Sequence, residues 1–339
     1  MIDVDRFEEQ LDLALTDELR SAIGLATAPA PVPARAPAKA RSQHQKASTT
    51  RPPSVGNETV PSLLRAGRMQ DADRLISERR AHAEQHGTPA DRRDAALWAT
   101  MQALRDGRAE DARAGSLTVR ALSAETGDGR PDDRFWGQQF WIVLDWGDRD
   151  ERHELLDVCR ERAYGRSDLY WRARLALLCA RMGRDDEATR EFDSCVAQLG
   201  ANRPAPDPET QLLITDLVET ATLLRDPARG RSLQGPLGVP TARMIFDDRS
   251  YICKGASTRY QALVLTASRR WEDCDQAFQQ AVDSNRASGA LPLVARVLND
   301  WGSSLTDRGD SRAWECLKES AELARRLHMT GAISGMPSR

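Results

Sequence analysis

The stretch Arg181-Met-Gly-Arg-Asp-Asp-Glu-Ala-Thr-Arg-Glu-Phe-Asp-Ser-Cys195 decides the fold. A Gly-Arg turn is followed, five residues after Gly183, by the small residue Ala188. The bulky Phe192 comes four residues later and the small Cys195 three after that. Steps of four and three keep these side chains on one face of a helix, and small residues let a neighbouring helix approach closely. The stretch therefore predicts a turn followed by the second helix of a helical hairpin.

The same small–large–small triplet recurs along the chain. The copies are Ala72/Ile76/Arg79, Ala112/Ser116/Val119, Arg152/Leu156/Cys159, Ala188/Phe192/Cys195, Ala228/Ser232/Gly235, Cys274/Phe278/Ala281 and Ala313/Leu317/Ser320. Their first members lie 40, 40, 36, 40, 46 and 39 residues apart, and the copy at Ala228 rests mainly on this spacing. A glycine stands five residues before each of the first four copies, where it would end the preceding helix in a left-handed conformation. These repeats predict an all-α, tetratricopeptide-like superhelical solenoid of about seven helical hairpins.

Apolar and aromatic residues between the triplets indicate the first helix of each pair. These segments are Ala95–Leu104, Phe135–Leu144, Leu169–Met182, Gln211–Leu224, Ala256–Ala267 and Leu293–Leu305. Sustained alternation with a period of two is absent from the sequence, so we expect no β-structure.

The chain divides into four expected parts. Residues 1–25 are predicted to form an acidic amphipathic helix, which would dock either on the repeat domain or on a partner. Residues 26–57 form a basic linker rich in Pro and Ala, residues 58–330 the repeat domain and residues 331–339 a tail. The linker has no aromatic residue for stacking on bases, which favours a solvated spacer over a nucleic-acid contact.

Composition argues against several classes of protein. The net charge of -3 and the pI near 6.0 give no electrostatic reason to expect nucleic acid, so direct DNA binding is not expected. No apolar run approaches the length of about 18 residues that spans a membrane, and the acidic start Ile2-Asp-Val-Asp-Arg6 differs from a basic signal peptide. We expect a cytoplasmic protein whose six cysteines are free, with Cys159, Cys195 and Cys274 at packing positions of the repeat.

The sequence contains no recognisable catalytic or metal-binding motif. His82 and His86 lie one helical turn apart, but no carboxylate or thiol completes a set of metal ligands. His153 begins His-Glu-Leu-Leu-Asp, which lacks the second histidine of a zinc helix. A Gly-x-Ser-x-Gly nucleophile elbow is absent as well. We therefore expect no catalytic residue, no metal and no cofactor.

The glycine and the small–aromatic–small pattern resemble tetratricopeptide-type repeats, with a period near 40 in place of about 34 residues. Residues 69–331 are also similar to the C-terminal helical-repeat region of large high-GC bacterial regulators of the AAA-type ATPase, LuxR-type and SARP-type. The phrases that carry this similarity are Phe135-Trp-Gly-Gln-Gln-Phe140, Arg172-Ala-Arg-Leu-Ala-Leu-Leu178, Arg269-Arg-Trp-Glu-Asp-Cys-Asp-Gln-Ala-Phe278, Leu293-Val-Ala-Arg-Val-Leu298 and Ala324-Arg-Arg-Leu-His-Met-Thr-Gly331. Such regulators carry a P-loop ATPase, whereas Gly-x-x-x-x-Gly-Lys-Ser/Thr is absent here. The resemblance implies a sensor or scaffold part alone.

The resemblance also implies that the first helix of each pair lines a concave groove. An aromatic cluster over residues 135–146 would either pack between repeats or form a groove wall that grips a peptide or a small molecule. The groove candidates are Trp98, Trp136, Gln139, Trp171, Arg259, Tyr260, Arg296 and Asn299. Arg259 and Arg296 would suit an anionic partner.

The expected function is non-catalytic binding. A scaffold or regulatory module, linked to transcriptional or biosynthetic regulation, would hold a protein partner or peptide, or a small-molecule ligand, in the groove. Two alternatives stay open. An enzyme on a repeat scaffold, for example one of secondary metabolism, would contain a buried polar cluster with perturbed protonation. A DNA-linked regulator would bind DNA through the basic linker in a salt-sensitive way.

Overall fold

A computed structural model describes residues 58–126, 133–202, 208–238 and 243–330 of the chain. Helices separated by short turns make up almost all of these residues. These residues belong to one unit of the chain, which spans residues 52–339. The predictions for residues 1–25, 26–57 and 331–339 fall outside the described residues. The prediction of an all-α protein is confirmed in its main point, since the described part contains fifteen helices and a single two-stranded hairpin.

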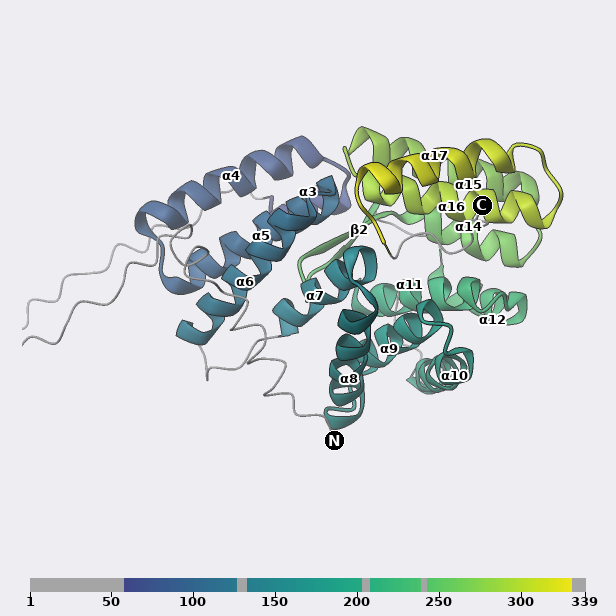
Figure 1. Cartoon of the computed structure of the whole chain (residues 1–339), viewed down its shortest axis with the longest axis horizontal. Helices are drawn as coiled ribbons and strands as arrows, with labels where there is room; N and C mark the ends of the chain where they lie inside the picture. Colours follow the sequence, from purple (N-terminus) through teal and green to yellow (C-terminus); the bar gives the residue numbers. More distant parts are fainter. Residues whose placement is uncertain (1–57, 127–132, 203–207, 239–242, 331–339) are drawn as a thin grey trace, which may run out of the picture. The chain divides into compact units, whose positions relative to one another are not determined.

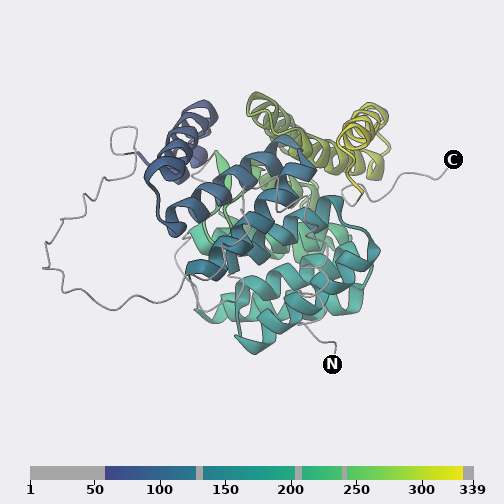
Figure 2. The ribbon, with the colours of Figure 1, turned by 60° about the vertical axis from the view of Figure 1, so that its left-hand side comes forward.

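Fourteen of these helices form seven consecutive pairs whose members contact each other. The pairs are α3 (Val60–Arg65) with α4 (Met69–His86), α5 (Pro89–Asp106) with α6 (Ala109–Thr126), α7 (Asp133–Trp146) with α8 (Arg149–Gly165), α9 (Leu169–Arg181) with α10 (Asp185–Asn202), α11 (Pro208–Leu223) with α12 (Pro227–Ser232), α14 (Ser257–Ala267) with α15 (Trp271–Ala287), and α16 (Leu291–Asp307) with α17 (Ala313–Arg326). The short helix α13 (Gln234–Leu237) follows α12. Figures 1 and 2 show this succession from purple α3 and α4 to yellow α17.

Local sequence explains where a typical helix of these pairs begins and ends. At the start of α5, the Thr88 side chain accepts a hydrogen bond from the backbone N–H of Asp91, and Pro89 occupies the first helical position. Both features satisfy or remove backbone donors that a helix start leaves without partners. At the other end, Gly107 adopts a left-handed conformation with φ of 78° and lets the chain turn back into α6.

The triplet pattern marks packing positions in the well-formed copies. Ala188, Phe192 and Cys195 on α10 are all at most 1% exposed, and the copy on α15 is equally buried. The weak copy at Ala228 is different, because its three positions are exposed on and beyond the short helix α12. That segment buries Gly230 and Leu233 instead. The Ala228 triplet is therefore not a packing motif.

The expectation of no β-structure is wrong at one place. Strands β1 (Met244–Asp247) and β2 (Ile252–Ala256) pair antiparallel around a turn at residues 248–251. Every residue of both strands is buried. A strand that is covered on both faces has no polar face, so it shows no alternation of period two for sequence analysis to detect.

The hairpin contacts helices from both ends of the described chain. Strand β1 touches α3 and α11, and β2 touches α5, α14 and α15. The backbone N–H of Arg243 donates to the carbonyl of Arg65 at 2.8 Å. On α5, Trp98 stacks on Phe246 of β1 with ring centroids 5.5 Å apart. The hairpin thus forms part of the core, between segments that are distant in sequence (Figure 1).

Direct contacts also join the middle of the chain to its last described helices. The Trp146 indole N–H donates to the Leu327 carbonyl at 2.9 Å, and the Thr330 N–H donates to the Asp145 carbonyl at 2.9 Å. Helix α16 packs on α5. In an open solenoid each repeat touches only its sequence neighbours, so these contacts depart from a purely one-dimensional stack. None of the described helices is long and apolar enough to cross a membrane.

Candidate ligand-binding site

The structure buries most of the side chains that the sequence proposes for a groove. Trp98 on α5, Trp136 on α7 and Trp171 on α9 are at most 5% exposed. Arg259 and Tyr260 on α14 and Arg296 on α16 are at most 2% exposed. Gln139 and Asn299 are partly buried, and the Gln139 amide donates to Ser116 Oγ at 3.0 Å. Six of the eight candidates therefore belong to the interior and offer no surface for a partner in this structure.

The two arginines expected to meet an anionic partner are paired with carboxylates of the same chain. Arg259 contacts Glu219 Oε1 at 3.0 Å and Asp300 Oδ2 at 2.8 Å. Arg296 pairs with Asp145 at the end of α7. Their positive charge is thus satisfied internally, and the reason for assigning them to an external anion no longer holds.

A buried network of charges surrounds these pairs, and sequence analysis did not foresee it. Arg174 on α9 donates to Asp247 Oδ2 at 2.6 Å, and the Tyr170 hydroxyl binds the same carboxylate. The Tyr170 hydroxyl also lies 2.7 Å from Ser250 Oγ in the hairpin turn. Gly137 makes this approach possible, because a Cβ at that position would lie 1.8 Å from Ser250 Oγ. Asp247 therefore ties α9 to the hairpin.

The network continues along α11 to Asp216 and Glu219. Lys254 Nζ donates to Asp216 Oδ1 at 2.5 Å. Burial alone would raise the pKa of Glu219, but the positive charges of Arg259, Lys254 and other basic groups outweigh burial and hold that pKa well below its usual range. Glu219 is therefore a permanent anion that compensates the cations around it.

A cavity of about 20 Å³ lies among residues that include Trp141, Asp145, Lys254 and Arg296. This volume is close to what a single water molecule needs. This cavity is therefore too small to admit a substrate.

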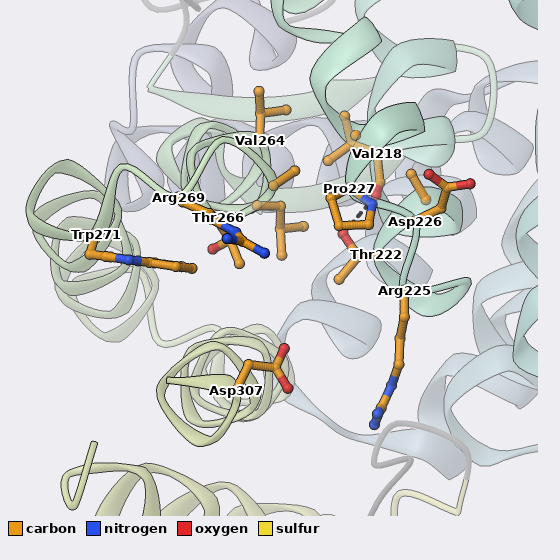
Figure 3. A pocket seen from close by; sticks show the side chains of 14 residues that line it. Val218, Thr222, Arg225, Asp226, Pro227, Val264, Thr266, Arg269, Trp271 and Asp307 are labelled. Atoms are coloured by element: carbon orange, nitrogen blue, oxygen red, sulfur yellow. Dashed lines mark hydrogen bonds between the residues drawn. The ribbon is translucent and has the colours of Figure 1, made fainter. Parts of the chain in front are cut away.

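A much larger cavity, here called the α11–α14 cavity, has a volume of about 450 Å³. Its lining comes from α11, the turn into α12, α14, the start of α15 and the end of α16 (Figure 3). The apolar part of the lining consists of Val218, Ala221, Pro227, Gly230, Leu263, Val264 and Ala267. The polar part consists of Thr222, Arg225, Asp226, Thr266, Arg269, Trp271 and Asp307. This size falls within the range of sites that hold small molecules, roughly 300–1,000 Å³.

The charged groups at this cavity differ in their partners. Asp226 is engaged, because its carboxylate accepts from the first N–H groups of α12 and pairs with Arg229. Within the described part of the chain, no ion pair includes Arg225, Arg269 or Asp307. In Figure 3 the Arg269 guanidinium, the Trp271 ring and the Asp307 carboxylate point into the same space. The Arg225 side chain extends away from these three in the same view, so Arg269 and Asp307 face the cavity and Arg225 lies at its edge.

A second cavity of about 350 Å³ lies next to the first and shares Val264 with it. The amides of Gln234, Gln261, Gln276 and Gln280 contribute to its lining. Arg270 and Asp273 also line it, and they form an ion pair with each other.

Sequence analysis missed Arg225 and Arg269, although a signal was present. Arg269 stands five residues before Cys274, at the place where the first four triplets have glycine. The last three copies have Leu223, Arg269 and Arg308 at this position, so the departure from glycine was visible at Arg269 but was not unique to it. Its meaning depends on the fold, because only the structure brings Arg225 and Arg269 to one cavity.

No protein-family model and no curated protein matches the chain, so these comparisons do not indicate what the site binds.

Proposed function

We propose that this chain is a non-catalytic binding module, built from tetratricopeptide-like helical hairpins, that holds a ligand in the α11–α14 cavity. The observation that carries the proposal is the cavity itself, with its apolar floor and the unpaired side chains of Arg225, Arg269 and Asp307. An apolar pocket with a few convergent polar groups is the usual form of a ligand site. The resemblance to the repeat regions of bacterial regulators supports a regulatory role for such binding.

The buried charges support a structural use of the interior. Arg259 and Arg296 complete pairs within the chain, as do Arg174 and Lys254. Pairing of this kind compensates the penalty of removing charges from water. We accordingly propose the cavity as the binding site; its lining still comes largely from the first helices α11, α14 and α16, but not from the candidate residues that the sequence favoured.

One observation favours the alternative of an enzyme. That hypothesis expects a buried polar cluster with perturbed protonation. Burial raises the pKa of Tyr170, and nearby cations lower the pKa of Glu219, within the buried network that also contains Arg174. Incubation of the full chain with a metabolite extract of its native cell separates the two functions. Consumption of a metabolite that the Lys254→Met variant, verified as folded, no longer consumes would support the enzyme. Retention of a metabolite without turnover would support the binding module.

Native mass spectrometry of the protein from its own cell tests the binding proposal directly. Thr222 is exposed at the rim of the α11–α14 cavity, so Thr222→Trp would fill the cavity without disturbing the core. We expect a bound ligand on the wild-type protein and its loss in this variant. Ser77→Trp, on the exposed face of α4, is the control and should keep the ligand. Equal ligand content in both variants would contradict the proposal.

A further inference from the structure

Two arginines occupy backbone positions that glycine fills elsewhere in the fold. In six of the seven helix pairs, the first helix ends with one residue in the left-handed conformation, and the next N–H bonds back to a carbonyl five residues earlier. The six residues are Gly67 (φ 73°), Gly107 (φ 78°), Gly183 (φ 68°), Arg225 (φ 52°), Arg269 (φ 55°) and Gly309 (φ 71°). The two non-glycine positions belong to consecutive pairs and line the same cavity.

The arginines are not explained by folding. A left-handed conformation is strained for any residue with a Cβ and free of strain for glycine. Neither Arg225 nor Arg269 compensates with an ion pair inside the described part of the chain, and both are exposed. Ser167, Tyr251 and His328 are also left-handed non-glycine residues, and none of them lines the cavity. Strain that is retained where two cations meet a cavity indicates use of those cations.

The charge balance at the cavity favours an anion. Asp226 is neutralised by Arg229 and by the start of α12. Among the residues that the structure describes, the lining charges outside any ion pair are then two positive, Arg225 and Arg269, and one negative, Asp307. Guanidinium groups bind carboxylate, phosphate and sulfonate oxygens through pairs of charge-assisted hydrogen bonds. The apolar floor requires that the rest of the ligand be apolar.

We propose that the α11–α14 cavity selects an amphiphilic oxyanion, whose apolar body lies against the more exposed lining residues Pro227, Ala267 and Trp271 and whose carboxylate or phosphate group binds Arg269, with Arg225 adding positive charge at the edge of the cavity. This inference rests on the proposed function, in which the same cavity binds a ligand. It adds the chemical class of that ligand and assigns the selectivity to the two left-handed arginines.

A matched pair of fluorescent probes tests the inference on the full chain. 8-Anilinonaphthalene-1-sulfonate is an amphiphilic anion, and N-phenyl-1-naphthylamine has nearly the same apolar body without the charge. We expect the anionic probe to bind more tightly and to weaken as salt increases. Displacement of this probe by 1-naphthoate and by 1-naphthyl phosphate, with 1-naphthol as the neutral competitor, distinguishes a carboxylate from a phosphate ligand.

Glycine substitutions at the two arginines are the decisive variants, because they remove the charge and relieve the strained backbone. Arg225→Gly and Arg269→Gly should each weaken the anionic probe roughly threefold to tenfold and leave the neutral probe unchanged. Both should unfold at a temperature at or above that of the wild type, so lost binding would not reflect misfolding. Asp307→Asn should strengthen anion binding, since it removes the opposing charge. Arg80→Gln, at an exposed site on α4, is the control and should change nothing.

The outcomes test the anion selectivity separately from the proposed binding of a ligand in the cavity. If Thr222→Trp abolishes binding of both probes while the glycine variants bind like the wild type, the cavity is a binding site but the anion selectivity is refuted. If Thr222→Trp leaves both probes bound, the cavity is not their site, and the inference and the proposed function fail together. The inference stands only if the glycine variants lose affinity for the anionic probe alone.

Discussion

Arg296 on α16 forms a buried ion pair with Asp145 near the end of α7, although 151 positions separate them in the sequence. A second bond from the same guanidinium, from Nε to Asp145 Oδ1, measures 3.2 Å. The Asp145 carbonyl accepts from the N–H of Thr330 as well. Asp145 on α7 therefore contacts both α16 and the residues that follow α17.

Removing one member of this pair should destabilise the protein more than removing both. We expect Asp145→Leu or Arg296→Met alone to lower the free energy of unfolding by about 3–5 kcal/mol, because each leaves a buried charge without compensation. The double variant should lose much less, since apolar residues of similar volume can replace a buried pair. Urea denaturation of the four proteins in a double-mutant cycle measures the coupling. Additive losses would show that the pair is not a unit.

Glu219 offers a similar test within the charge network. Glu219→Gln keeps the shape of the side chain but leaves Arg259 and Arg181 without their common counter-ion. We expect a loss of about 3–5 kcal/mol in the free energy of unfolding. The matched control is Glu319→Gln, which breaks the half-exposed pair with Arg286 and should cost less than about 1 kcal/mol. Comparable losses in the two variants would contradict a compensating role for Glu219.

Exchanging glycine and arginine between equivalent turns should change stability in opposite directions. Gly183 has φ of 68°, and a Cβ there would meet no atom within 4 Å. The effect of Gly183→Arg therefore reflects only the strain of a left-handed backbone, and we expect this variant to lower the free energy of unfolding by about 1 kcal/mol. Arg225→Gly and Arg269→Gly should each stabilise by up to about 1 kcal/mol. Thermal and urea unfolding give the values, and a destabilising Arg→Gly change would mean that these side chains support the fold.

The buried thiols predict a loss of stability in alkali. Burial raises the pKa of Cys159, Cys179 and Cys195 to about 12, from an ordinary value of 9.0. The unfolded chain releases these protons at lower pH than the folded chain, so their contribution is complete below about pH 9 and is lost as the pH rises toward 12. Between about pH 9 and 10 the free energy of unfolding should begin to fall, with a slope approaching about 1.4 kcal/mol per unit for each thiol.

Unfolding measurements at closely spaced pH values check this prediction, with Cys159→Ala as the comparison. That variant is less stable throughout but should show a shallower decline, because one titrating group is gone. An identical slope in the two proteins would rule out Cys159 as a contributor.

Most of the helical architecture could be predicted because it depends on local patterns. Gly107 and Gly183 end helices as expected, and Ala188, Phe192 and Cys195 pack as their spacing indicates. Helix periodicity and turn glycines lie within a single repeat, so they predict its helices without knowledge of the rest of the chain.

The hairpin and the charge network could not be predicted, for a different reason. Asp247 reads as a turn residue, and its carboxylate does accept the N–H groups of Arg249 and Ser250. Its pairing with Arg174 joins residues 73 positions apart, and no local pattern encodes that contact. The burial of the arginine candidates could not be predicted either, because an arginine on an apolar helix face has the same sequence pattern whether its anion is external or, as for Arg259, comes from Glu219.

The hydrogen bonds that join Leu327 and Thr330 to the end of α7 limit how the length of related sequences can vary. A linear array can gain or lose a terminal unit during evolution, since the new end resembles the old one. In this chain, adding or deleting a helical hairpin between Asp145 and Thr330 would separate the two partners of each of these hydrogen bonds. We therefore expect related chains to conserve the number of units in this interval and to vary in length elsewhere.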